Sequence, residues 1–134
     1  DEVRKGADTT LMDHLSDLID TAPDGGFVFA NFVEFDSLYG HRRDVSGYAR
    51  HLEWFDAALS ALLPKLRAGD LLCVTADHGN DPTWIGTDHT RERVPILIHG
   101  AGARDLGHVA FVDVATTIAT HLGVLSQGPG KNLL

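Results

Sequence analysis

An apolar run that ends in an acidic residue and a histidine limits the choice of fold for this chain. The run covers residues 71–76 and leads directly into Asp77 and His78, and a further candidate ligand, His89, follows eleven residues after His78. A short apolar run is typical of a buried strand, and open α/β sheets carry their chemistry in the loops just beyond such strands. Carboxylate and imidazole together suit a divalent cation such as Mn²⁺ or Zn²⁺. The stretch therefore predicts part of a metalloenzyme.

Helical and strand-like patterns alternate along the rest of the chain. Apolar residues at helical spacing predict helices over residues 9–20, 44–66 and 113–122, with Thr9 or Thr10 and Asp44 as caps of the first two. Short apolar runs predict strands over residues 26–33, 70–75 and 94–99. This alternation favours an α/β fold in which a mostly parallel sheet is flanked by helices.

Composition excludes several classes of function. With 134 residues the chain is one domain or part of one, and its formal net charge of −8 leaves no basic surplus for binding nucleic acid. No apolar stretch approaches the roughly 18 residues of a membrane span. The single cysteine, Cys73, allows no disulfide within the chain, which agrees with a reducing cytosol. Because the chain begins at Asp1, we expect a segment of a longer or processed protein.

Two loops carry the candidate metal ligands. Asp36 and His41 follow the first predicted strand, whereas Asp77, His78 and His89 follow the second. Parallel strands bring such loops to one edge of the sheet, so we expect the five side chains to converge. One cation takes three or four ligands, and five favour a pair of metal ions that clamps the attacking and leaving oxygens in phosphoryl or hydrolytic chemistry.

Other polar residues have simpler interpretations. An Asp-His pair on its own is more often an ordinary polar pair in a loop. We assign structural or solvent-exposed roles to the remaining histidines, which are His14, His51, His99, His108 and His121. Arg42 and Arg43 are either phosphate-binding groups or a solvated pair beside Asp44.

Three motifs together resemble the phosphopentomutase family of the alkaline phosphatase superfamily. They are DHGNDPTWIGTDHTRE over residues 77–92, NFVEFDSLYGHRRD over residues 31–44, and GPGK over residues 128–131. The resemblance runs over nearly the whole chain, and the first motif is highly specific. Its Asp-His-Gly core alone also fits the wider superfamily, including cofactor-independent phosphoglycerate mutase. Asn80, Ile85 and Glu34 stand where the family more often has Cys, Pro and Asp, and none of them is at a ligand position.

The resemblance implies a division of the ligands between two Mn²⁺ ions, with Zn²⁺ as the alternative metal. Asp36, His41 and His89 match the three protein ligands of one ion. Asp77 and His78 match two ligands of the other ion. In the family that second ion also takes an aspartate and the threonine nucleophile, both of which belong to sequence upstream of this chain.

The resemblance also implies what residues 1–134 are. We expect the C-terminal segment of a metal-binding catalytic core domain, a partial alkaline-phosphatase-like core, without its N-terminal segment and cap domain. The complete enzyme is expected to be cytoplasmic and to interconvert the 1-phosphates and 5-phosphates of ribose or 2-deoxyribose. Its partners would be the sugar phosphate and the remainder of the same polypeptide, and the segment alone would tend to self-associate.

Three functions remain open. The first is the metal-binding part of a phosphopentomutase, which we expect to be inactive alone because the chain holds no catalytic nucleophile. The second is another enzyme of the superfamily, such as a phosphoglycerate mutase or a phosphatase. The third is a non-catalytic metal-binding fragment.

Overall fold

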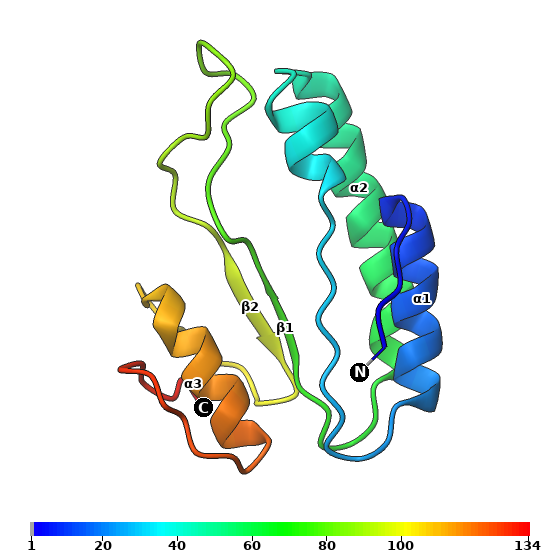
Figure 1. Ribbon diagram of the computed structural model, residues 1–134, viewed down its shortest axis with the longest axis vertical. Helices are drawn as coiled ribbons and strands as arrows, with labels where there is room; N and C mark the ends of the chain where they lie inside the picture. The colour runs from blue at the N-terminus through cyan, green and yellow to red at the C-terminus, as the bar shows by residue number, and fades with distance from the viewer. Residues whose placement is uncertain (1) are drawn as a thin grey trace. The chain divides into compact units, whose positions relative to one another are not determined.

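The structure, a computed structural model, describes residues 2–134 and divides them into two units (Figure 1). The first unit comprises the chain up to Arg67 together with residues 78–94. The second comprises residues 68–77 and 95–134. No helix in the described part of the chain is both long enough and apolar enough to cross a membrane.

Helices dominate the first unit. They are α1 (Asp8–Thr21), the π-helix η1 (Phe35–Gly40), α2 (Val45–Leu62) and the short 3₁₀-helix η2 (Leu63–Lys65). The two long helices were predicted from their apolar spacing. The Asp44 side chain caps α2, as predicted, by accepting a hydrogen bond of 2.8 Å from the Gly47 backbone N–H. The predicted threonine cap of α1 is wrong, because the helix already begins at Asp8 and has Ala7 at its N-cap.

A buried polar pair ties α1 to α2. Asp8 is 1% exposed, and its carboxylate lies 2.9 Å from His51 Nε2 and accepts a hydrogen bond of 3.2 Å from the Glu34 backbone N–H. The His51 ring stacks on Trp54 with ring centroids 4.7 Å apart, and it also contacts Phe35. The predicted structural role of His51 therefore agrees with its surroundings.

The backbone over residues 26–33 is extended but does not form a strand (Figure 1). A strand requires a backbone partner, and the part of the chain described here provides none for this segment. Phe32 packs against Phe55 with ring centroids 5.3 Å apart, whereas Phe27 and Phe29 are 59% and 79% exposed. The prediction of a buried strand here is wrong, although its apolar pattern marks a non-helical stretch.

A two-stranded antiparallel sheet forms the second unit with α3 (Phe111–His121). Strands β1 (Leu72–Thr75) and β2 (Ile96–His99) pair with Leu72 opposite His99 and Thr75 opposite Ile96. Both strands were predicted, but their antiparallel pairing differs from the expected parallel one. A parallel pair needs a crossover, usually a helix, and residues 76–95 contain no helix. The α/β class is correct, and a mostly parallel sheet is not seen among the described residues.

The C-terminal tail folds back on the start of α3. The Asp113 carboxylate accepts hydrogen bonds of 2.8 Å from the backbone N–H groups of Ala110 and Lys131. Both hydrogen bonds lower the pKa of the Asp113 carboxyl, and the bond from Lys131 has the larger effect. A Cβ atom at Gly130 would come within 2.1 Å of the Val112 carbonyl oxygen, so only glycine allows this approach. The motif GPGK thus anchors the tail to α3.

Candidate metal centre

Three of the predicted ligands meet in the first unit. His41 Nε2 lies 3.3 Å from Asp36 Oδ2, and His89 Nε2 lies 3.4 Å from Asp36 Oδ1. The two imidazole Nε2 atoms are 3.1 Å apart. One carboxylate and two imidazole nitrogens therefore lie close together, and they form a donor set suited to Mn²⁺ or Zn²⁺.

A π-helix produces the contact between Asp36 and His41. Its hydrogen bonds join residues five apart, and the His41 backbone N–H donates to the Asp36 carbonyl at 2.9 Å. The next such bond, of 3.0 Å, runs from the Asp44 N–H to the Tyr39 carbonyl. Residues five apart thus lie one above the other in η1, and their side chains meet. The sequence motif over residues 31–44 already indicated this turn. Its two candidate ligands are five residues apart, and residues at that spacing do not share a face of an α-helix.

His78 lies in the same cluster. Its ring stacks on that of His89, with centroids 3.7 Å apart and planes inclined by 21°. One ligand atom from each of Asp36, His78 and His89 lies within 4.8 Å of the other two. Asp77 belongs to the second unit, at the end of its segment over residues 68–77, whereas the cluster lies in the first unit. Its role as a ligand therefore stays a prediction.

The orientation of His41 is suited to binding a metal. Its Nδ1 makes a short contact with the Thr87 carbonyl oxygen. A carbonyl can only accept, so Nδ1 carries the proton, and in the neutral ring Nε2 has the free lone pair. That Nε2 atom is the one facing Asp36 and His89. Histidines that bind metals characteristically donate their other N–H group in this way.

Asn80 and Arg43 support these ligands, although neither their residue types nor their spacing predicted these roles. Asn80 Nδ2 donates to Asp36 Oδ1 at 2.7 Å, and Arg43 Nη1 donates to Asn80 Oδ1 at 2.6 Å. The Arg43 guanidinium also donates to the carbonyl oxygens of Gly40, Asp81, Gly86 and Asp88. The prediction that Arg43 belongs to a solvated pair beside Asp44 is therefore wrong, because its guanidinium is bonded to protein acceptors.

The loop over residues 78–94 is shaped by its own polar contacts. Gly79 and Thr90 form an antiparallel bridge, and the Asp81 backbone N–H donates to Thr90 Oγ1 at 2.6 Å. The Thr83 hydroxyl and backbone N–H donate to the Asp81 carboxylate and lower its pKa, to which the Arg43 charge also contributes. The loop is thus a turn-rich hairpin that presents His78 and His89 from its two arms.

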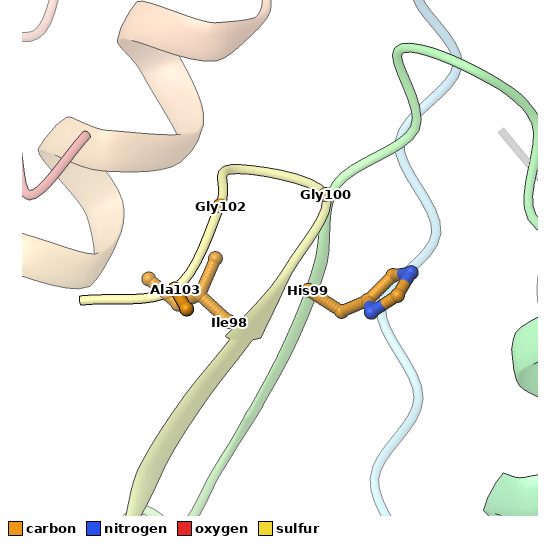
Figure 2. A pocket seen from close by; sticks show the side chains of 5 residues that line it. All are labelled: Ile98, His99, Gly100, Gly102 and Ala103. Carbon is orange, nitrogen blue, oxygen red and sulfur yellow. The ribbon is translucent and has the colours of Figure 1, made fainter.

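Two other places could be considered as sites. The carboxylates of Asp8 and Glu34 and the His51 ring bring ligand atoms within 4.8 Å of one another, but Asp8 and His51 already satisfy each other. A hollow beyond β2 in the second unit is lined by Ile98, His99, Gly100, Gly102 and Ala103. Figure 2 shows Ile98 and His99 on opposite sides of β2, so this hollow has few convergent polar groups.

Comparison with known proteins defines the class. Residues 3–126 match the family described as the metalloenzyme superfamily, and the chain belongs to it. Within that class it is similar to phosphopentomutases. It is 48% identical over 136 residues to the phosphopentomutase of Methylobacterium radiotolerans, covering 99% of this chain and 34% of that protein. It is 55% identical over 137 residues to the phosphopentomutase of Chelativorans sp., covering 99% of this chain and 34% of that protein. It is 53% identical over 131 residues to the phosphopentomutase of Chromohalobacter salexigens, covering 92% of this chain and 31% of that protein. The chain spans about a third of the length of these relatives.

Proposed function

We propose that this chain is the metal-binding part of a phosphopentomutase. The observation that carries the proposal is the meeting of Asp36, His41 and His89, whose facing atoms lie 3.1–3.4 Å apart, in a chain 48–55% identical to phosphopentomutases. The reaction is the interconversion of (deoxy)ribose 1-phosphate and (deoxy)ribose 5-phosphate in the cytoplasm. The substrate is the sugar phosphate.

Each proposed ligand has a place in this function. Asp36, His41 and His89 hold one Mn²⁺, and Asp77 and His78 contribute to a second. Zn²⁺ is the alternative metal. When bound, the cations supply electrostatic stabilisation of the charge on a transferring phosphoryl group. The Asp36 carboxylate balances cationic charge, and the Thr87 carbonyl keeps the His41 Nε2 lone pair directed at the site.

The remainder of the polypeptide completes the enzyme in this proposal. It supplies a nucleophile, the further ligand of the second ion, a cap domain that grips the substrate, and strands that extend the sheet into a mostly parallel, alkaline-phosphatase-like one. The exposed Phe27 and Phe29 side chains beside an unpaired backbone support such an extension. Residues 1–134 alone would then give no turnover.

A product assay tests the proposed reaction. The polypeptide that contains this segment, supplied with Mn²⁺, is expected to convert ribose 1-phosphate into ribose 5-phosphate, and His41→Ala is expected to abolish the conversion. Release of inorganic phosphate would instead indicate a phosphatase, and conversion of 3-phosphoglycerate to 2-phosphoglycerate would indicate a phosphoglycerate mutase. Metal binding without any of these reactions would indicate a non-catalytic metal-binding protein.

A further inference from the structure

We propose that Arg43 and Asn80 are positioning residues of the metal centre, an inference that rests on the proposed metal-binding function. A chain of two hydrogen bonds runs from the Arg43 guanidinium through the Asn80 amide to the Asp36 carboxylate, with lengths of 2.6 and 2.7 Å. This chain fixes Asp36 on η1 relative to the loop that carries His78 and His89.

Arg43 connects the two ligand-bearing segments. It donates to the Gly40 carbonyl of η1 at 3.0 Å, and to the loop carbonyls of Asp81 and Asp88 at 2.9 and 2.6 Å. Its Nε atom donates to a third loop carbonyl, that of Gly86. The acceptors lie around one planar guanidinium with a fixed arrangement of N–H donors. Its Nη1 atom faces three of them, the oxygens of Gly40, Asn80 and Asp81, so two of these share one N–H group. A lysine ammonium has three donors on one atom and cannot reach the same set.

The backbone of Arg43 is held in an unusual conformation. Its φ angle is +55°, and no other non-glycine residue in the described part of the chain has a positive φ. A side chain in this region has a conformational cost, which persists only where surrounding contacts determine the geometry. The five hydrogen bonds of the guanidinium provide those contacts.

Arg43 also sets the orientation of the Asn80 amide. A guanidinium can only donate, so the Asn80 oxygen faces Arg43 and the Asn80 NH₂ group faces Asp36. The amide approaches closely because position 40 is glycine, where a Cβ atom would lie 2.5 Å from Asn80 Nδ2. The Asp36 carboxylate therefore receives a donor that holds the plane of its two oxygens, one beside His41 and the other beside His89.

The hydrogen-bonded chain from Arg43 through Asn80 to Asp36 serves to raise the affinity of the site for metal. Groups that orient metal ligands typically change metal affinity about 10–100-fold when they are removed. We expect Asn80→Ala to release the Asp36 carboxylate, and Arg43→Lys to release the whole loop. Arg42→Lys is the matched control, since Arg42 is the exposed neighbour and the substitution is the same.

The test uses the 134-residue chain and two readouts. Mn²⁺ affinity is measured by competition with a fluorescent chelator, and Co²⁺ is bound in a parallel sample so that its visible absorption spectrum reports the geometry of the ligands. Arg43→Lys and Asn80→Ala are each expected to weaken Mn²⁺ binding by about 10–100-fold and to alter the Co²⁺ spectrum. Arg42→Lys is expected to change neither.

A metal-free readout keeps this inference separate from the proposed reaction. Chymotrypsin cleaves after aromatic residues, and Trp84 lies exposed in the loop. Arg43→Lys is expected to speed this cleavage several-fold without metal, whereas Arg42→Lys is not. Failure of the mutase assay would reject the reaction and leave this comparison intact. Asn80→Ala carries the test if circular dichroism shows that Arg43→Lys does not fold.

Two results would overturn the inference. One is unchanged Mn²⁺ affinity and an unchanged Co²⁺ spectrum in folded Asn80→Ala and Arg43→Lys. The other is an equal loss in Arg42→Lys, which would show that general charge, and not the hydrogen-bonded chain, governs affinity.

Discussion

At the scale of single residues, the centre depends on which atom of each side chain faces its neighbours. The contact between His41 Nδ1 and the Thr87 carbonyl directs Nε2 toward Asp36. The amide of Asn80 is likewise oriented by Arg43. Residue types alone could identify Asp36, His41 and His89 as ligand candidates. The supporting contacts could not be predicted, because they join residues 37–46 positions apart in sequence.

The division of ligands between two metals gives a prediction for single substitutions. Asp36, His41 and His89 form a three-ligand set, so His89→Ala is expected to lose the tighter Mn²⁺ site of the chain. His78→Ala is expected to keep most of that affinity. The free Mn²⁺ signal in electron paramagnetic resonance measures both, with His121→Ala, at an exposed position of α3, as control. The reverse order of effects would reject the division, and the stacking of His78 on His89 makes this comparison informative.

At the scale of elements, local patterns and pairing between segments differ in how far they can be predicted. The helices α1 and α2 follow from apolar spacing, and the start of α2 follows from Asp44, because these signals act within a few residues. The positions of β1 and β2 were also predicted. The sequence did not predict that these strands pair antiparallel or that residues 26–33 remain unpaired. Both depend on which backbone segments meet in the fold, and an apolar run carries no information about its pairing partner.

The pair of Asp8 and His51 is expected to hold α1 against α2. Asp8→Ala would leave the His51 ring and the Glu34 backbone N–H without their buried partner. The expected loss in free energy of unfolding is about 1–3 kcal/mol for an unsatisfied hydrogen bond, and up to roughly 5 kcal/mol if the pair is charged. Urea unfolding of Asp8→Ala against Asp13→Ala, an exposed position of the same helix, measures it. Equal stability of the two variants would contradict this role.

The anchoring of the tail to α3 is expected to depend on pH. The pKa of Asp113 is lowered from 3.8 by hydrogen bonds from Lys131 and Ala110, so the folded state favours the ionised form. Its contribution to stability is present above the unfolded-state pKa near 4 and is lost as the pH falls through the lower folded-state pKa. Thermal melts of the chain between pH 6 and about pH 2 are expected to show this loss.

Asp113→Asn is the matched variant for that measurement. It keeps an acceptor oxygen but does not ionise, so its melting temperature should fall less across the same acidic range. Asp56→Asn, at an exposed position of α2, is expected to leave the profile of the chain unchanged. If the melting temperature of Asp113→Asn fell with pH as much as that of the unchanged chain, the tail contact would not be the cause of the acid sensitivity.

At the scale of the whole molecule, little apolar surface is fully buried. Met12 and Leu62 are the buried apolar side chains among the described residues, whereas Phe27, Phe29 and Leu125 are among the large ones that are exposed. The hydrophobic contribution of about 25 cal/mol per Å² scales with the apolar area removed from water, so the scarcity of fully buried side chains limits this term. Unpaired backbone beside exposed phenylalanines also favours association with another chain.

We therefore predict that residues 1–134 self-associate and are stabilised by Mn²⁺. A ligand that binds only the native state adds about 2.7 kcal/mol at one hundred times its dissociation constant. Light scattering should fall in a Phe27→Ser, Phe29→Ser double variant. The melting temperature should rise with Mn²⁺ in the unchanged chain but not in Asp36→Asn. A monomeric chain indifferent to Mn²⁺ would show instead that this segment is self-sufficient.

The π-helix η1 makes the site sensitive to length as well as to residue type. Asp36 and His41 meet because five residues fill one widened turn. Gain of one codon between them would set the pair six residues apart, which at 100° per residue of an α-helix lies about a third of a turn off the shared face. Point substitutions at Ser37 or Leu38 keep the count intact. Over evolutionary time we therefore expect Ser37 and Leu38 to vary in residue type more readily than the stretch gains residues.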